Sequence, residues 1–123
     1  MEKYKEIISI NIYTHSDEEK NVIGAALHNA LVGNENYINN RVILNIDTPW
    51  TIYVYIYDDC TDIEGILKTI EEALSGFSSI DQNFVKFAID TFAQMDRQYT
   101  CDLVIDISKN QKSININVNE LED

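Results

Sequence analysis

The chain has 123 residues, of which 45% are hydrophobic and 24% are charged, with one proline and four glycines. This length and composition fit a single domain (residues 1–123) with one hydrophobic core and argue against a disordered chain. The 21 acidic and 9 basic residues give a net charge of −12, which disfavours direct binding to nucleic acid or to an anionic membrane, because both need clustered Lys and Arg.

The first predicted strand covers residues 7–14, where isoleucines alternate with polar side chains. The isoleucines on its apolar face are Ile8, Ile10 and Ile12. Ser16 and Glu19 then form a capping box, and apolar residues at helical spacing continue to Leu31. We therefore expect a helix here, followed by a loop in the asparagine-rich segment 34–40.

Residues 41–46 and 51–57 are predicted to form an antiparallel hairpin around the turn 47–50, whose Pro49 cannot join a sheet ladder. The second of these strands has the sequence Thr-Ile-Tyr-Val-Tyr-Ile-Tyr. Successive side chains on a strand point to opposite faces, so one face is aliphatic and the other carries three tyrosines. We expect the rest of the sheet to be built around this strand.

Two helices are predicted next. The capping box Thr61–Glu64 begins the first, whose apolar stripe runs to Phe77 and in which Glu64 and Lys68 are spaced to form an ion pair. Ser79 is expected to cap the second, which has an apolar stripe over residues 84–95. Two further alternating segments, residues 101–108 and 114–119, predict a hairpin that ends the chain.

The predicted order is therefore β-α-β-β-α-α-β-β. Each strand has one aliphatic face and one mostly polar face, whereas strands covered by helices on both sides are apolar throughout. We thus expect an α/β (α+β) two-layer sandwich, in which three helices cover one face of a five-stranded, mostly antiparallel sheet.

The uncovered face of this sheet is the candidate binding surface. By alternation it holds Tyr13, Tyr53, Tyr55, Tyr57, Asp102, Asp106, Asn115, Asn117 and Asn119. Tyrosine is enriched at binding hot spots, and neighbouring acids favour a cationic partner. Two alternatives are that the tyrosines only stabilise the sheet through cross-strand packing, and that this face pairs with a second copy of itself.

Motifs for chemistry are weak. The acidic segment Asp58–Gly65 has some likeness to a calcium loop, but it fails the EF-hand spacing and is better explained as a helix cap. The two cysteines, Cys60 and Cys101, lack a metal-binding spacing and would need further ligands to hold zinc. No phosphate loop, dinucleotide fingerprint or nucleophile elbow is present, so we expect no catalytic residue, metal or cofactor.

The apolar runs are too short for a membrane span, and the first residues lack the apolar segment of a signal peptide, so the sequence predicts a cytoplasmic location. The net charge alone is explained by a need for solubility, but an acidic surface also suits a basic partner.

We therefore expect a non-enzymatic acidic binding protein that neutralises a basic, toxin- or nuclease-like protein. Immunity proteins, antitoxins and phage-type inhibitors of bacterial or phage origin belong to this class, and some mimic nucleic acid. The expected binding residues are Tyr53, Tyr55, Tyr57, Asp58, Asp59, Asp102 and Asp106. The alternative is an assembly or chaperone-like protein that acts as a homo-oligomer. A hydrolase using Asp58, Asp59 and Asp62 is a third, less favoured class.

Overall fold

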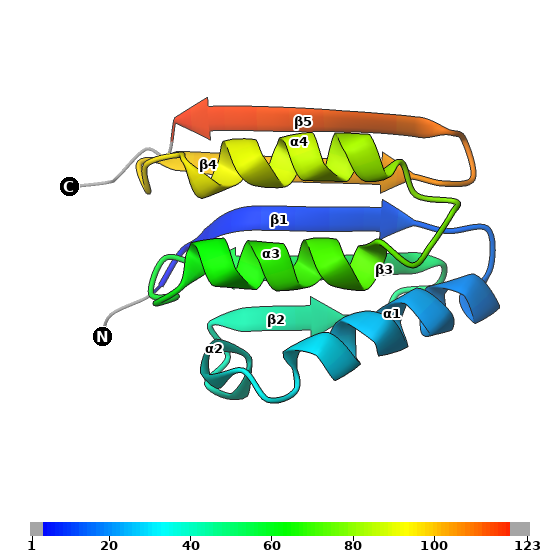
Figure 1. Ribbon diagram of the computed structural model, residues 1–123, viewed down its shortest axis with the longest axis horizontal. Helices are drawn as coiled ribbons and strands as arrows, with labels where there is room; N and C mark the ends of the chain where they lie inside the picture. Colours follow the sequence, from blue (N-terminus) through cyan, green and yellow to red (C-terminus); the bar gives the residue numbers. More distant parts are fainter. Residues whose placement is uncertain (1–3, 119–123) are drawn as a thin grey trace.

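The computed structural model describes residues 4–118 and contains a five-stranded sheet with helices packed on it (Figure 1). The strands are β1 (Glu6–Tyr13), β2 (Val42–Asn45), β3 (Thr51–Tyr57), β4 (Tyr99–Asp106) and β5 (Gln111–Val118). The helices are α1 (Asp17–Leu31), α2 (Glu35–Ile38), α3 (Ile63–Leu74) and α4 (Gln82–Ala93). Among these described residues, no helix is both long and apolar enough to span a bilayer.

The strand order across the sheet is β2-β3-β1-β4-β5. The pairs β2–β3, β3–β1 and β4–β5 are antiparallel, and β1–β4 is parallel. The parallel pair arises because α3 and α4, which run in opposite directions, separate β3 from β4 along the chain. The chain therefore returns to the end of the sheet at which β3 finishes, and β4 runs in the direction of β1.

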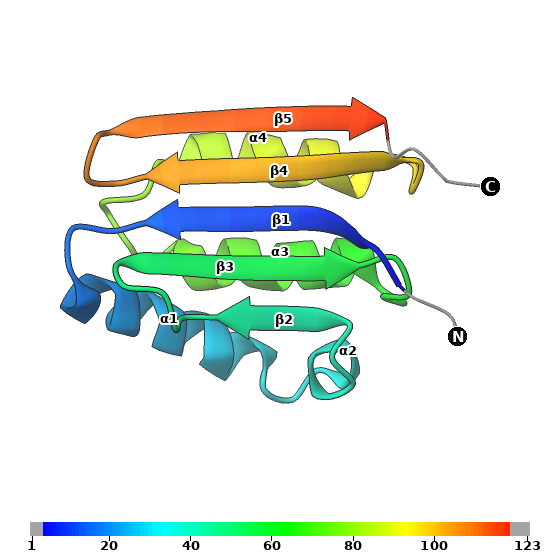
Figure 2. The same ribbon diagram turned by 180° about the vertical axis from the view of Figure 1, so that it is seen from behind.

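All the helices lie on one side of the sheet, and the opposite side is uncovered (Figures 1 and 2). The predicted two-layer arrangement is thus confirmed. The alternating aliphatic residues of the strands point toward the helices and meet the apolar stripes of α1, α3 and α4. Residues completely buried between the two layers include Ile10, Ile12, Ile23, Leu27, Ile52, Val54, Ile56, Ile66, Leu67, Ile70, Val85, Ile89 and Leu103.

The segment predicted as a loop contains one extra turn of helix, α2. Its N-cap is Asn34, whose side chain accepts a hydrogen bond from the N–H of Asn36. Asn36 is buried, and its side-chain oxygen accepts hydrogen bonds from both the N–H and the hydroxyl of Thr61. The buried side-chain amide of Asn36 therefore ties α2 to the loop before α3.

The helix caps differ in detail from the prediction. Ser16 caps α1 as expected, since its hydroxyl accepts from the N–H of Glu19 at 3.1 Å. The cap of α3 is Asp62 and not Thr61, and the cap of α4 is Asp81 and not Ser79. Both caps are carboxylates, which accept hydrogen bonds from N–H groups three residues later and carry the charge that a helix N-terminus favours.

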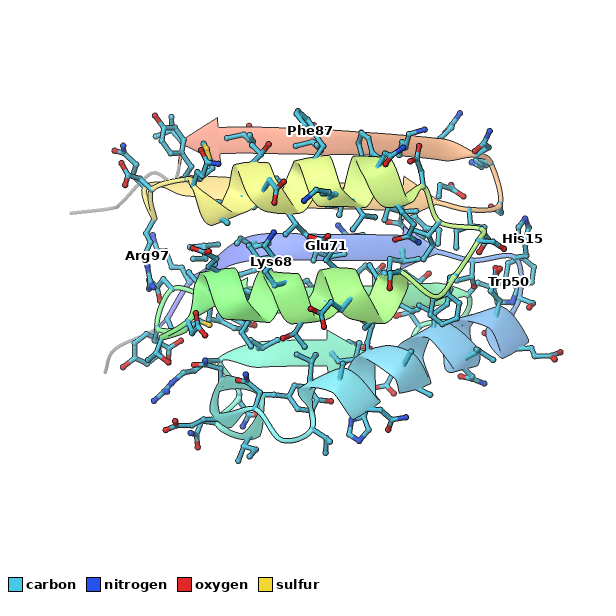
Figure 3. All side chains as sticks on the ribbon, in the orientation of Figure 1. His15, Trp50, Lys68, Glu71, Phe87 and Arg97 are labelled. Atoms are coloured by element: carbon cyan, nitrogen blue, oxygen red, sulfur yellow. The ribbon has the colours of Figure 1, made fainter. Side chains whose placement is uncertain are left out.

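The ion pair predicted for Lys68 also differs. Its ammonium lies 3.0 Å from Asp90 on α4 and 3.8 Å from Glu71, so it bridges two helices (Figure 3). The bridge depends on the packing of α3 against α4, which local spacing does not reveal.

Candidate functional site

The surface of the sheet opposite the helices, which Figure 2 shows from the front, is here called the open face. It carries the side chains that alternate with the buried aliphatic residues. Its strand residues, assigned from the pairing registers, are Glu6, Ser9, Asn11, Tyr13, Ile43, Asn45, Thr51, Tyr53, Tyr55, Tyr57, Thr100, Asp102, Val104, Asp106, Gln111, Ser113, Asn115 and Asn117. Of the predicted binding residues, the structure therefore brings Tyr53, Tyr55, Tyr57, Asp102 and Asp106 together on one surface. Asn119, also predicted here, lies outside the described residues.

The tyrosines form an ordered group. The rings of Tyr53 and Tyr55 are stacked, with centroids 5.8 Å apart and planes 9° apart. All three tyrosines of β3 and Tyr13 of β1 are partly exposed. Burial raises the pKa of Tyr55, and the charges of Glu6 and the neighbouring tyrosines raise it further. The Tyr55 hydroxyl therefore stays protonated at neutral pH and can donate a hydrogen bond to a partner.

Two carboxylates lie beside the tyrosines in an environment that disfavours their charge. Burial raises the pKa of Asp102, and burial together with the charge of Asp102 raises the pKa of Glu6. Among the strand residues that the structure describes on the open face, none is Lys or Arg. The described strand residues of the open face therefore supply no cation to this pair, and a positive charge brought in from outside would stabilise both ionised forms.

Asp106 is held differently. Its carboxylate accepts hydrogen bonds from the hydroxyl of Ser108 at 2.7 Å and from the N–H of Lys109 at 3.1 Å. The Ser108 hydroxyl, followed by the Lys109 N–H, lowers the pKa of Asp106. Asp106 is thus an ionised acid at the end of the open face that also stabilises the turn between β4 and β5.

Asp58 and Asp59 lie in the loop after β3 and not on the open face. The Asp58 carboxylate accepts a hydrogen bond from the N–H of Lys5 at 3.2 Å, and its backbone carbonyl accepts one from Arg97. Asp59 forms an ion pair with Arg41 at 3.6 Å, and its other carboxylate oxygen is buried with no hydrogen-bond partner among the described residues. Both acids therefore hold the end of β3 in place beside Tyr57, which Asp58 follows directly in the chain and with which Asp59 lines a common hollow.

Glu6 is a candidate residue that the sequence pattern did not reveal. Strict alternation places it on the same side as Ile8, toward the helices. The pairing of β1 with β3 shifts register between Glu6 and Ile8, so Glu6 lies opposite Tyr57 and Ile7 becomes buried. A β-bulge changes the face to which a side chain points, and its position is not encoded in the alternation.

Trp50 is a second candidate residue that the sequence pattern did not reveal. It is 54% exposed at the turn before β3 and has a φ of 62°, which is unusual for a bulky side chain. Its N–H donates to Asp17 at 2.9 Å, and its carbonyl accepts from the N–H of Thr14 at 2.8 Å. These bonds hold the indole in an exposed position at the same end of the sheet as His15 (Figure 3).

A cavity of about 180 Å³ lies between the end of α4 and the first residues of β1 and β4. Ile7, Phe92, Met95 and Cys101 line it together with Asp96 and Arg97, whereas Asp58, Asp59 and Asp62 do not. Burial and the nearby Asp102 raise the pKa of the Cys101 thiol to about 11. The thiol is therefore protonated at neutral pH and is a poor nucleophile.

The molecule thus presents an acidic, tyrosine-rich sheet surface, and the cavity beside Cys101 lies elsewhere. Two further hollows border this surface, one of about 320 Å³ lined by Val104, Asp106, Gln111 and Ser113 and one of about 330 Å³ lined by Ile43, Tyr57 and Asp59. Comparison of the chain with models of known protein families, with curated proteins and with solved structures finds no match.

Proposed function

We propose that this protein is a non-enzymatic binding protein that neutralises a basic protein through its open face. The observation that carries the proposal is the uncovered sheet surface on which Tyr53, Tyr55 and Tyr57 adjoin Glu6 and Asp102. The strand residues described on this face include no Lys or Arg. The chain as a whole carries a net charge of −12.

The proposed partner is recognised by cationic side chains. A guanidinium group can stack on an aromatic ring while it donates hydrogen bonds to a carboxylate, and Tyr55 lies close enough to Glu6 for their charges to interact. A cation bound there would relieve the unfavourable charge of Glu6 and Asp102. Partner binding would therefore release protons from these carboxyls when the pH is near their raised pKa values.

Immunity proteins, antitoxins and phage-type inhibitors act in this way, by covering a basic surface of a toxin or nuclease. The acids supply long-range attraction, which speeds the encounter with the partner. The tyrosines supply contact area, which slows dissociation of the complex. Asp106, Asp58 and Trp50 lie where they would contribute at the border of the interface. Asp59 contributes indirectly, by holding the loop after β3 through Arg41.

Binding measurements against basic proteins, beginning with any that neighbouring genes encode, test the proposal. The double variant Glu6→Gln/Asp102→Asn should weaken binding and reduce its dependence on salt. The double variant Glu35→Gln/Glu72→Gln removes the same charge from exposed helix positions and should change binding much less. Equal losses in the two variants would indicate that only net charge matters and would exclude the open face as the specific site.

A second candidate function, an assembly or chaperone-like homo-oligomer, draws support from the uncovered edge of β5.

A further inference from the structure

β5 is a long edge strand with one side unpaired. It pairs with β4 over eight residues, Gln111 to Val118, and no other strand in the described part of the chain meets its outer side. Seven of these residues are exposed, and Ile114 is the exception. The opposite edge strand, β2, has only four residues, none of them exposed. The two edges of the sheet therefore differ in how much backbone they offer to another strand.

The outer edge of β5 carries a single feature of the kind that usually prevents strands from pairing, the charge of Lys112, which lies on the helix side of the sheet and forms an ion pair with Asp81 at 3.3 Å. Proteins protect edge strands with prolines, bulges, inward-pointing charges or short length. β5 contains no proline and no acid, its pairing with β4 is regular, and its single charge is Lys112. Such an edge is a template for a further antiparallel strand.

An apolar strip accompanies this edge on the helix side of the sheet. Ile114, Ile116 and Val118 lie opposite Leu103, Cys101 and Tyr99 of β4 and so point toward the helix layer. α4 covers them incompletely, since Ile116 remains 39% exposed and Val118 67% exposed. Phe87 on α4 is 62% exposed and extends on the side of that helix turned to β5 (Figure 3).

We propose that β5 pairs with β5 of a second copy, antiparallel and about a two-fold axis at Ile116. In this register Ile116 faces its own copy and Ile114 faces Val118, so every residue of the apolar strip meets an apolar residue. On the other side of the strand, Asn115 faces Asn117. A strand that matches itself in this way is what a two-fold symmetric interface requires.

The charges on β5 favour a second copy of this chain over a basic protein as the partner that pairs with its outer edge. A strand from a basic protein would bring cations against Lys112, the single charged residue of β5. The two copies of Lys112 are separated by eight residues, or about 27 Å along the strands, well beyond the Debye length of about 8–10 Å. β5 is also free of the acids that would repel a second copy of a chain with a net charge of −12.

The proposed dimer has one continuous sheet with a two-fold axis perpendicular to it. Both helix layers then lie on one side and both open faces on the other. Two tyrosine-rich surfaces would face in the same direction, which allows bivalent contact with a partner that is itself a dimer or carries two basic sites.

Sedimentation velocity of the full chain over a range of concentrations tests the proposal. The expected mass of the unmodified protein is twice 14.1 kDa. Ile116→Lys sets two like charges at the axis and should reduce the mass to that of one chain. Val22→Lys, which changes an exposed apolar residue on α1, should leave the dimer intact. A monomer at all concentrations, or a dimer that survives Ile116→Lys, overturns the proposal.

Cysteine cross-linking tests the register. Residues directly opposite each other in an antiparallel pair have Cα atoms about 4.5–5.5 Å apart, within the range of a disulfide. Ile116→Cys should therefore form a covalent dimer under mild oxidation. Asn115→Cys sets the two thiols about 8 Å apart by Cα and should not. The native cysteines are both buried, which makes the unmodified chain a suitable blank. Efficient cross-linking at residue 115 and none at residue 116 would refute the proposed register.

Discussion

Glu6 lies opposite Tyr57 across β1 and β3, because the pairing shifts register at Ile7. This shift turns an acid toward the open face and buries an isoleucine. Glu6 thereby joins Tyr55 and Asp102, whose charges interact with it. A local irregularity in one strand thus completes the acidic and aromatic surface that we propose as the binding site.

Tyr55→Ala should weaken partner binding by about 2 kcal/mol or more, which corresponds to about a 30-fold change in affinity. Because aromatic contacts act after encounter, we expect the loss mainly in the dissociation rate. The two charge-removing changes Glu6→Gln and Asp102→Asn should instead lower the association rate and flatten its salt dependence. Stopped-flow or surface-based kinetics at two salt concentrations separates these effects. Unchanged affinity after Tyr53, Tyr55 and Tyr57 are all replaced, in a folded variant, would show that the site is elsewhere.

Asp102→Asn should raise the free energy of unfolding at neutral pH. Burial raises the pKa of Asp102, so this group favours folding most below its ordinary value of 3.8 and loses that contribution as the pH rises through its higher value in the folded state. An uncharged residue of the same shape avoids the loss. Thermal unfolding of the variant and of the unmodified protein from pH 3 to pH 7 measures this difference in stability. The gain in melting temperature of the variant should shrink toward pH 3.

Asp106→Asn is the matched control, because it removes the same charge from the same strand. The pKa of Asp106 is lowered by the hydroxyl of Ser108 and the N–H of Lys109, so its stabilising contribution is present above pH 3.8 and is lost as the pH falls through its lower value. This variant should melt at a lower temperature than the unmodified protein at pH 7. If both variants gained stability equally, relief of net negative charge would explain the effect of Asp102→Asn.

Ile56→Ala and Leu67→Ala should each destabilise the protein by about 2–5 kcal/mol, because each leaves a cavity between the sheet and the helices. Both side chains are completely buried. Val22→Ala, at a position 56% exposed on α1, should change stability by less than about 0.5 kcal/mol. Urea titrations followed by circular dichroism provide the comparison. A cost below 1 kcal/mol at both core positions would contradict this packing.

Cys60 and Cys101 should react slowly with thiol reagents in the folded protein and rapidly after unfolding. Both are buried and unpaired, and burial raises the pKa of each thiol, that of Cys101 to about 11. Little thiolate is therefore present at neutral pH. A chromogenic disulfide reagent, applied with and without urea, measures the two rates. The double variant Cys60→Ser/Cys101→Ser should retain partner binding, and a loss of binding without loss of fold would assign the thiols a role in the site.

Periodicity along the sequence predicts most of the side chains that the strands bury and the three longer helices that cover them, although Ile7 is also buried and Ile116 and Val118 stay exposed. Alternation with a period of two along residues 51–57 and helical spacing along residues 63–74 are local properties, and each element must bury its apolar side whatever its neighbours are. The one-sided sandwich and the tyrosine surface could therefore be predicted. The folded chain is needed to establish the strand order, the parallel pairing of β1 with β4, the reversal of Glu6 at the bulge and the pairing of Asp59 with Arg41. These relationships join segments that are distant in the chain, and they depend on how loops close and registers match, which local periodicity does not specify.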